Sequence, residues 1–212
     1  LPHLAIIGIG CNLACYGGII PDDKNMQELS KLVDSLEKEF QIDLKIISGG
    51  NSANHEWFKS CKNVGRVNNI RLGESILLGC ETISRKAIPG LHTGAFQLVA
   101  EVIESKKKPS LPFGEIGQDA FGNIPSFQDR GIHQRVIIAL GNQDVVPTGL
   151  HFNNKLKLLG SSSDHIILDS KCNSIKAGDE VRASLNYGGL LSTMTSPFVR
   201  KHFTDCNGSA AI

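Results

Sequence analysis

The chain has 212 residues, enough for one large domain or two small ones, and hydrophobic residues make up 41% of it, which is adequate for a buried core. The formal net charge of +1 gives no reason to expect nucleic acid or an acidic membrane surface as a partner. No apolar run approaches the roughly 20 residues that cross a bilayer, and the start lacks the charged region and cleavage site of a signal peptide.

The six cysteines are scattered and include no CxxC pair, so neither a zinc site nor a dense disulfide framework is indicated. Reduced cysteines in a cytoplasmic protein are the simplest interpretation, and we expect no metal. The cysteines are Cys11, Cys15, Cys61, Cys80, Cys172 and Cys206.

The first part of the chain repeats a rhythm of strand, loop and helix three times. Short continuous apolar runs at Leu4–Ile9, Leu44–Ile47 and Val67–Leu72 are typical of strands buried on both faces of a parallel sheet. Apolar residues at helical spacing predict an amphipathic helix over about 24–40. Shorter helices are expected over 53–61 and from Ser75. This rhythm predicts a parallel α/β arrangement with functional loops after the strands.

Two of these strands end in polar, glycine-rich turns. One strand runs into the turn 48–52, which reads SGGNS, and the next runs into the turn 71–75, which reads RLGES and precedes an apolar helical run. Glycines let the backbone come close to a ligand, a following helix directs N–H groups at it, and an arginine adds a fixed positive charge. Two such turns side by side predict one phosphate-bearing cofactor.

From about Gly94 apolar and polar residues begin to alternate, and turns rich in Gly, Pro, Asn and Asp separate the later runs, which predicts an antiparallel β domain. The segment Ile175–Val181 is typical of a β-barrel turn, where Gly-Asp reverses the chain. The basic run 106–108 is expected to be a solvated turn. The later strand runs are Arg135–Leu140, Lys155–Leu159, His165–Leu168 and Glu180–Leu185.

Three α/β units alone would leave unpaired parallel strand edges, and a parallel barrel needs eight strands to close. The chain also begins with Leu1 and enters directly into a buried-looking strand. We therefore expect residues 1–92 to be the end of a barrel whose beginning is absent. The β domain is expected over 93–204, with a flexible tail over 205–212.

Several separated motifs together resemble the alanine racemase family of amino-acid racemases, which bind pyridoxal 5'-phosphate (PLP) on a barrel. The Gly-Gly-Asn-Ser turn, the later Arg-Leu-Gly-Glu turn and the β domain carry the likeness to the family. Three further motifs resemble its ornithine racemase-like subgroup, and the similarity extends from about Leu4 to Phe203. These motifs are NLACYGG at 12–18, GEIGQDAFGN at 114–123 and SSDH at 162–165.

The resemblance implies a (β/α)8 barrel followed by a β domain, assembled as a head-to-tail homodimer that racemises an amino acid. Residues 1–92 would match only the last three barrel units. The lysine that binds PLP covalently lies on the first barrel strand of that family, and no lysine here sits in a matching motif. The resemblance therefore implies that the missing N-terminal half of the barrel supplies this lysine.

The resemblance assigns the phosphate of PLP to the two glycine-rich turns. Asn51 and Ser52 match the phosphate-side Asn-Ser, with the Ser52 hydroxyl and N–H as donors. Gly73 and Glu74 match the backbone N–H donors at the next strand end, where free amides favour a dianion. The ordinary alternative is a strand-to-helix N-cap at Ser52.

The ring of PLP is assigned two further residues. Arg71 matches the arginine that faces the pyridine nitrogen, keeps it unprotonated and so limits how far the ring withdraws charge from the substrate carbanion. The ordinary alternative for Arg71 is a structural salt bridge. Asn12 stands beside the ring, where many alanine racemases carry a histidine.

Racemisation needs one proton removed on one face of the substrate and one returned on the other. The resemblance gives the missing lysine as one base and a β-domain tyrosine as the second, but the counterpart of the tyrosine here is Phe121, which cannot titrate. Asp119 in the same loop is the substitute that we favour. Asp164 and His165 are further candidates, although a hydrogen-bonded structural role explains His165 at least as well.

Other functions compete with this interpretation. A lyase of the D-threonine aldolase type shares the barrel and β domain, but it needs a metal near the C-terminus, where His202 and Cys206 would be the ligands. A single-barrel PLP carrier is disfavoured, since such proteins lack a β domain. A catalytically inert structural or dimerisation piece is the last alternative. The substrate is not fixed, and ornithine, alanine, lysine and serine all fit.

Overall fold

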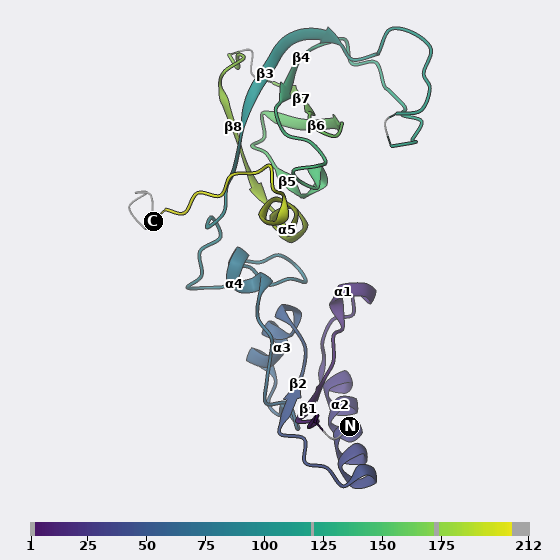
Figure 1. The fold of residues 1–212 in the computed structure, drawn as a ribbon, viewed down its shortest axis with the longest axis vertical. Helices are drawn as coiled ribbons and strands as arrows, with labels where there is room; N and C mark the ends of the chain where they lie inside the picture. The colour runs from purple at the N-terminus through teal and green to yellow at the C-terminus, as the bar shows by residue number, and fades with distance from the viewer. Residues whose placement is uncertain (1–2, 120, 172–173, 205–212) are drawn as a thin grey trace. The chain divides into compact units, whose positions relative to one another are not determined.

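A computed structural model of the protein describes residues 3–119, 121–171 and 174–204 (Figure 1). The tail predicted over 205–212 lies outside the described residues. The chain divides into two compact units, Leu1–Ala95 and Phe96–Ile212. Within the described part of the chain, no helix is both long enough and apolar enough to span a membrane.

The first unit contains a small parallel sheet. Strand β1 (Gly8–Gly10) pairs in parallel with β2 (Ile46–Ser48). A further parallel bridge joins Ser48 to Asn69, so three successive segments of the chain run in the same direction. The parallel direction agrees with the α/β arrangement that the strand and helix rhythm predicts.

These strands are shorter than the apolar runs predict. The prediction of a doubly buried strand over Leu4–Ile9 is wrong for its first residues, because Leu4 and Ile6 are 71% and 70% exposed. The strand predicted over Val67–Leu72 is reduced to the single bridge at Asn69. A parallel strand is buried only where neighbours cover it, and β1 pairs with β2 alone among the described residues.

The long helix predicted over about 24–40 is confirmed as α2 (Asp23–Phe40). A capping box starts it: the Asp22 side chain accepts the Asn25 N–H at 2.8 Å, and the Asn25 side chain accepts the Asp22 N–H at 3.0 Å. The buried face of the helix packs in a core with residues from β2 and the neighbouring loops. This core contains Met26, Leu29, Val33, Leu44, Ile47, Trp57 and Val67.

The remaining helices of the first unit are short. The helix predicted over 53–61 consists of the 3₁₀ turn η1 (Ser52–Asn54), which continues as α3 (His55–Ser60). The helix expected from Ser75 is α4 (Glu74–Leu78). A single turn, α1 (Ala14–Gly17), follows β1 and was not expected from the sequence.

The second unit is an antiparallel sheet with the strand order β5-β8-β3-β4-β7-β6, which confirms the predicted β domain (Figure 1). The long strand β3 pairs with β8 through its first residues and with β4 through its later ones, with a register shift between Val102 and Glu104. The strands are β3 (Leu98–Pro109), β4 (Ile132–Ile138), β5 (Leu150–His151), β6 (Leu156–Ser161), β7 (Ile166–Ser170) and β8 (Glu180–Leu185).

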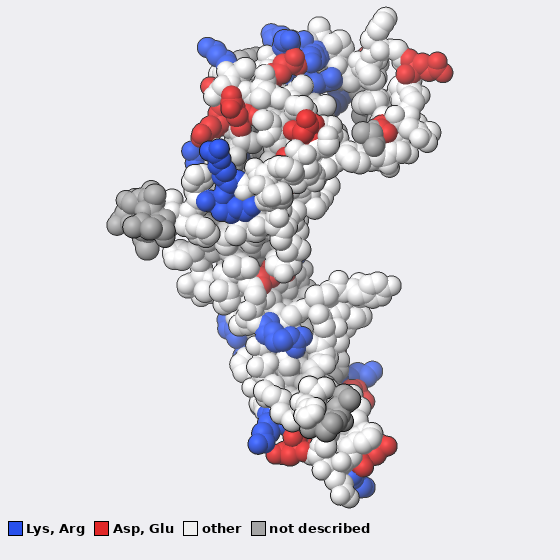
Figure 2. Space-filling model, in the orientation of Figure 1, with Lys and Arg blue, Asp and Glu red and all other residues white. Residues whose placement is uncertain are grey.

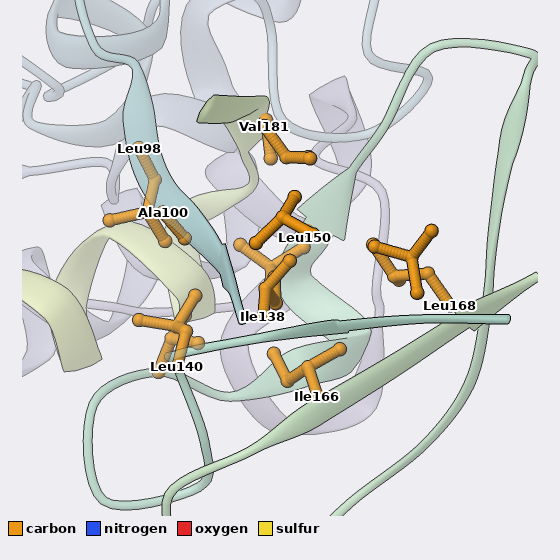
Figure 3. Close-up of a cluster of buried hydrophobic side chains, with 12 residues drawn as sticks. Leu98, Ala100, Ile138, Leu140, Leu150, Ile166, Leu168 and Val181 are labelled. Carbon is orange, nitrogen blue, oxygen red and sulfur yellow. The ribbon is translucent and has the colours of Figure 1, made fainter. Parts of the chain in front are cut away.

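One face of this sheet forms the hydrophobic core of the second unit (Figure 3). Alternate residues of each strand point to the same face, so the buried positions recur at every second residue. Val136 and Ile138 on β4, and Ile166 and Leu168 on β7, are all 0% exposed. Burying each such side chain contributes about 1.5–3 kcal/mol, which makes this face the main source of stability in the unit.

Two features of the second unit differ from the sequence prediction. The run 106–108 lies within β3 and not in a turn, and Lys106 and Lys108 both pair with Glu104 on the same strand. Figure 2 shows blue side chains gathered over the β3–β4 end of this unit. A helix, α5 (Tyr187–Thr195), and a 3₁₀ turn, η2 (Pro147–Gly149), were also not predicted.

The turn predicted over Ile175–Val181 is confirmed. Gly178 has a φ of 91°, a conformation that favours glycine. The Asp179 carboxylate accepts the Lys176 N–H at 2.8 Å, and the chain then enters β8. A Gly-Asp pair therefore reverses the chain before a strand, as its sequence indicates.

Candidate cofactor site

The two glycine-rich turns lie side by side at the ends of neighbouring parallel segments. Asn51 caps η1, because its side-chain oxygen accepts the Ala53 N–H at 2.9 Å. The amide nitrogen of the same side chain donates to Asn12 Oδ1 at 3.0 Å and to Cys15 Sγ at 3.2 Å. The structure therefore brings together Asn12 and Asn51, which the sequence places 39 residues apart.

Ser52 joins the first turn to the second. The residue is only 4% exposed, and its hydroxyl oxygen accepts the Gly73 N–H at 3.3 Å, the Ser75 N–H at 3.1 Å and the Ser75 hydroxyl at 3.1 Å. A hydroxyl has two lone pairs and one proton, so three donors exceed what its oxygen fully accepts. Ser52 is therefore well supplied with donors, and its own proton is left to donate.

The glycines of the two turns serve different purposes. A Cβ on Gly49 would lie 2.8 Å from Val67 and 3.2 Å from Met26, and one on Gly50 would collide with the Asn54 side chain. The chain itself therefore fills the Cβ sides of both glycines, so the lack of a side chain is needed there for packing. A Cβ on Gly73, by contrast, would meet nothing within 4 Å.

The donors around Gly73 suit a phosphate. Gly73 is exposed, and Glu74 directly after it begins α4, where backbone N–H groups lack carbonyl partners within the helix. The Glu74 carboxylate pairs with Arg85, so its negative charge is partly offset. Hydroxyl and amide donors beside open space are the groups that bind phosphate oxygens.

Arg71 provides a positive charge next to these donors. Its Nη1 donates to Ser48 Oγ at 2.5 Å and its Nη2 donates to the Cys11 carbonyl at 2.9 Å. Among the described residues, the ion pairs of arginine all involve other arginines. Arg71 therefore forms no salt bridge with a carboxylate of the described residues, which disfavours the alternative of a structural salt bridge.

Cys11 next to this arginine has a structural role. Its thiol donates to the Gly49 carbonyl at 2.9 Å. Burial raises the pKa of the Cys11 thiol, although the charge of Arg71 works in the opposite direction. A thiol that stays protonated and donates to the backbone is a poor nucleophile.

The three candidate bases, Asp119, Asp164 and His165, lie in the second unit. One oxygen of the Asp119 carboxylate accepts the N–H groups of Asn123 and Phe121, both at 2.9 Å, and these bonds hold the pKa of Asp119 below its usual value. His165 Nδ1 lies 3.0 Å from Asp164 Oδ1. The hydroxyl of Ser163 and the neighbouring His165 lower the pKa of Asp164. Asp119 thus closes its own loop, whereas His165 is paired with a carboxylate.

The proposed metal ligands of the competing lyase cannot be compared, because Cys206 lies outside the described residues. In the part of the chain that the structure describes, no three side chains of His, Cys, Asp or Glu are grouped as a metal site.

Sequence reasoning gave no role to Ser48, Ser75 or Cys15. All three lie in the motifs described above, but the role of each depends on which distant side chain it contacts in the fold. Ser48 contacts Arg71 across 23 residues, and Ser75 contacts Ser52 across the same separation. Such long-range hydrogen bonds leave no periodicity or local pattern in a sequence.

The chain is similar in sequence to two racemases. It is 43% identical over 204 residues to the ornithine racemase of Acetoanaerobium sticklandii, a match that covers 95% of this chain and 58% of that protein. It is 42% identical over 198 residues to the lysine racemase of Thermotoga maritima, and this match covers 92% of this chain and 56% of that protein. The chain therefore spans little more than half the length of these relatives. No family model matches it.

The fold is similar to that of alanine racemases of known structure. The enzyme of Clostridium difficile in complex with cycloserine gives a TM-score of 0.58 at 16% identity, with 97% of this chain and 58% of that chain covered. The Bartonella henselae enzyme with covalently bound PLP gives a TM-score of 0.53 at 19% identity, with 91% of this chain and 52% of that chain covered. The predicted fold class is thereby confirmed. By sequence the chain is similar to amino-acid racemases, and by fold to alanine racemases of known structure, which agrees with the family resemblance that its motifs carry.

Proposed function

We propose that the protein to which this chain belongs is a PLP-dependent amino-acid racemase. The observation that carries the proposal is the meeting of three kinds of group at the two turns: the hydroxyl of the buried Ser52, the N–H groups of Gly73 and Glu74, and the Arg71 cation. Identity of 43% to an ornithine racemase and 42% to a lysine racemase supports it.

In this proposal the phosphate of PLP binds to the second turn and to Ser52. The Ser52 hydroxyl would donate a hydrogen bond to a phosphate oxygen, while its own oxygen accepts the N–H and the hydroxyl of Ser75. The N–H groups of Gly73 and Glu74 then donate to the same phosphate. In the structure the Gly73 N–H donates to the neutral Ser52 hydroxyl. Because a hydrogen bond to a charged acceptor is stronger, this N–H would favour the phosphate over Ser52.

Arg71 is proposed to face the pyridine nitrogen of the cofactor. When bound, PLP withdraws electrons and makes the α-proton of the substrate removable. A guanidinium carries N–H donors and no acceptor, so Arg71 would donate a hydrogen bond to the ring nitrogen. Asn12 is proposed to lie beside the ring, and Asn51, whose side chain donates a hydrogen bond to Asn12 Oδ1 at 3.0 Å, is proposed to lie on the phosphate side.

The base of the second face is proposed to be His165 or Asp119. The contacts favour His165: Nδ1 faces the Asp164 carboxylate at 3.0 Å and therefore carries the proton, which leaves Nε2 to accept one. The Asp119 carboxylate is already committed to two backbone N–H groups. The assignment of Asp119 therefore stays a proposal with less structural support.

The substrate and assembly are part of the same proposal. The names of the two relatives are those of racemases for ornithine and lysine, and both amino acids carry a terminal ammonium group. We therefore propose a diamino acid as the substrate, with a homodimer as the assembly and the cytoplasm as the location.

The experiment is a measurement of absorbance and chirality on the whole protein. We expect a visible band from covalently bound PLP that borohydride removes, and inversion of ornithine or lysine on chiral chromatography. The 212-residue chain alone is expected to lack the covalent band, because none of its lysines sits in the family motif. If the whole protein inverts none of ornithine, lysine, alanine and serine, the proposal is wrong.

A further inference from the structure

The guanidinium of Arg71 is held from two sides by neutral acceptors. Ser48 Oγ accepts from Nη1 at 2.5 Å and the Cys11 carbonyl accepts from Nη2 at 2.9 Å. Ser48 is only 6% exposed, so water competes little for its hydroxyl. Two of the five N–H donors of the guanidinium are thereby used, and one acceptor fixes each terminal nitrogen.

Gly10 leaves the space that this arrangement needs. A Cβ on Gly10 would lie 3.2 Å from Arg71 Nη1, 2.9 Å from Ser48 Cβ and 3.2 Å from the Ser48 carbonyl oxygen. Gly10 is not among the described glycines with positive φ. Its lack of a side chain is therefore needed for packing against Ser48 and Arg71 and not for an unusual backbone conformation.

The backbone around the guanidinium is itself fixed. The Cys11 N–H donates to the Ser48 carbonyl at 3.1 Å, which continues the pairing of β1 with β2. The Arg71 N–H donates to the Gly50 carbonyl at 2.9 Å. Both acceptors and the arginine therefore belong to one hydrogen-bonded frame, which has little freedom to follow a moving side chain.

We propose that Ser48 and Gly10 are positioning residues that set the plane of the Arg71 guanidinium, and we call them, with the Cys11 carbonyl, the arginine clamp. The inference rests on the proposed function, in which Arg71 faces the cofactor ring. Because a guanidinium is planar, fixing both terminal nitrogens fixes the direction of every remaining N–H. The clamp thus aims donors at the ring nitrogen before the cofactor arrives, which lowers the cost of ordering on binding.

The first test needs no cofactor. In the whole protein labelled with ¹⁵N-arginine, the two terminal nitrogens of Arg71 should give separate resonances, because each has its own acceptor and rotation is hindered. Arg71→Lys identifies these resonances by removing them. Ser48→Ala should merge them, and Gly10→Ala should shift them by displacing Nη1. Ser35→Ala is the matched control, since the exposed Ser35 hydroxyl donates to the Lys31 carbonyl at 2.9 Å, one turn earlier in α2.

The second test measures affinity for PLP by titration. Ser48→Ala should weaken binding about tenfold, the effect of losing one hydrogen bond to a charged group, while Ser35→Ala leaves it unchanged. Separate Arg71 resonances in Ser48→Ala, or unshifted ones in Gly10→Ala, together with native PLP affinity in that variant, would overturn the clamp. If the native protein binds no PLP, the proposed function fails, and the nitrogen resonances still decide whether the clamp exists.

Discussion

Ser52 is the residue on which the two turns converge. Three donors surround its oxygen, and the hydroxyl of Ser75 is one of them although its side chain is fully buried. Ser52 thus joins the first glycine-rich turn to the second, and it is the residue that we propose to bind the phosphate. We therefore expect a substitution of Ser52 to weaken the affinity for ligands that carry a phosphate more than the affinity for the ring alone.

The first prediction compares two forms of the cofactor. Ser52→Ala removes the donor to the phosphate, so we expect PLP affinity to fall about 10- to 100-fold, as for loss of a hydrogen bond to a charged group. Affinity for pyridoxal, which has no phosphate, should change much less. Titrations with the two ligands measure both values. An equal loss for PLP and pyridoxal would show that Ser52 supports the fold and not the phosphate.

The second prediction concerns the proton on the second face. Because His165 Nε2 is left to accept a proton, His165→Asn should lower kcat by about 10²- to 10⁴-fold. Asp119→Asn should lower it less, since that carboxylate serves its own loop. Steady-state racemisation in both directions measures the two variants. A larger loss in Asp119→Asn would return the role to Asp119.

Glu81 supplies a third prediction at a single residue. Burial raises the pKa of this carboxyl, but hydrogen bonds from the Ser84 hydroxyl and from the N–H groups of Lys86, Ile83 and Ser84 outweigh it and bring the pKa from 4.5 to about 2. Because the pKa is lowered in the folded state, the stabilisation is present above pH 4.5 and is lost as the pH falls towards 2.

We therefore expect Glu81→Gln to lower the free energy of unfolding by about 2–3 kcal/mol at pH 7. The difference from the native protein should shrink between pH 4.5 and 3. Urea unfolding at a series of pH values measures it, with the exposed Glu39→Gln as the control. A difference that stays constant from pH 7 to pH 3 would contradict the role of the charge.

Among the elements, α2 is the one that the sequence predicts best. The apolar spacing and the Asp22 cap both indicate a helix that starts at Asp23, and both signals lie within the segment itself. The prediction of a buried strand at Leu4–Ile9 fails because a run of apolar residues indicates only that the segment can be buried. Whether it is buried depends on the neighbours that cover it, which lie elsewhere in the chain. The helix α5 was not predicted because Gly188 and Gly189 lie in its first turn, where glycine normally argues against a helix.

The fourth prediction tests the cap of α2. Asp22→Ala removes the side chain that accepts the Asn25 N–H, so the free energy of unfolding should fall by about 1 kcal/mol. Asp22→Ser keeps an accepting oxygen and should restore most of the loss. Thermal and urea unfolding compare the two variants. Equal destabilisation by alanine and serine would show that the negative charge, and not the cap, is what stabilises the helix.

For the molecule as a whole, the sequence predicts the two kinds of unit and their order, because strand and helix rhythm differs from strict alternation over many residues. It also places most of the candidate cofactor residues in two turns, which the structure joins through Ser52, and the Asn51 side chain links the first turn to Asn12. The sequence does not reveal that Ser48 and Ser75 support them, since side-chain contacts between distant residues depend on the completed fold.

The central claim is that these turns bind PLP for racemisation. The most direct measurement is chiral chromatography of ornithine and lysine incubated with the whole protein, with and without added PLP, and with Arg71→Lys as the matched variant. We expect the native protein to convert either enantiomer towards an equal mixture, and Arg71→Lys to do so much more slowly, because lysine lacks the planar fork. No inversion by the native protein with PLP present, or full activity in Arg71→Lys, would contradict the account.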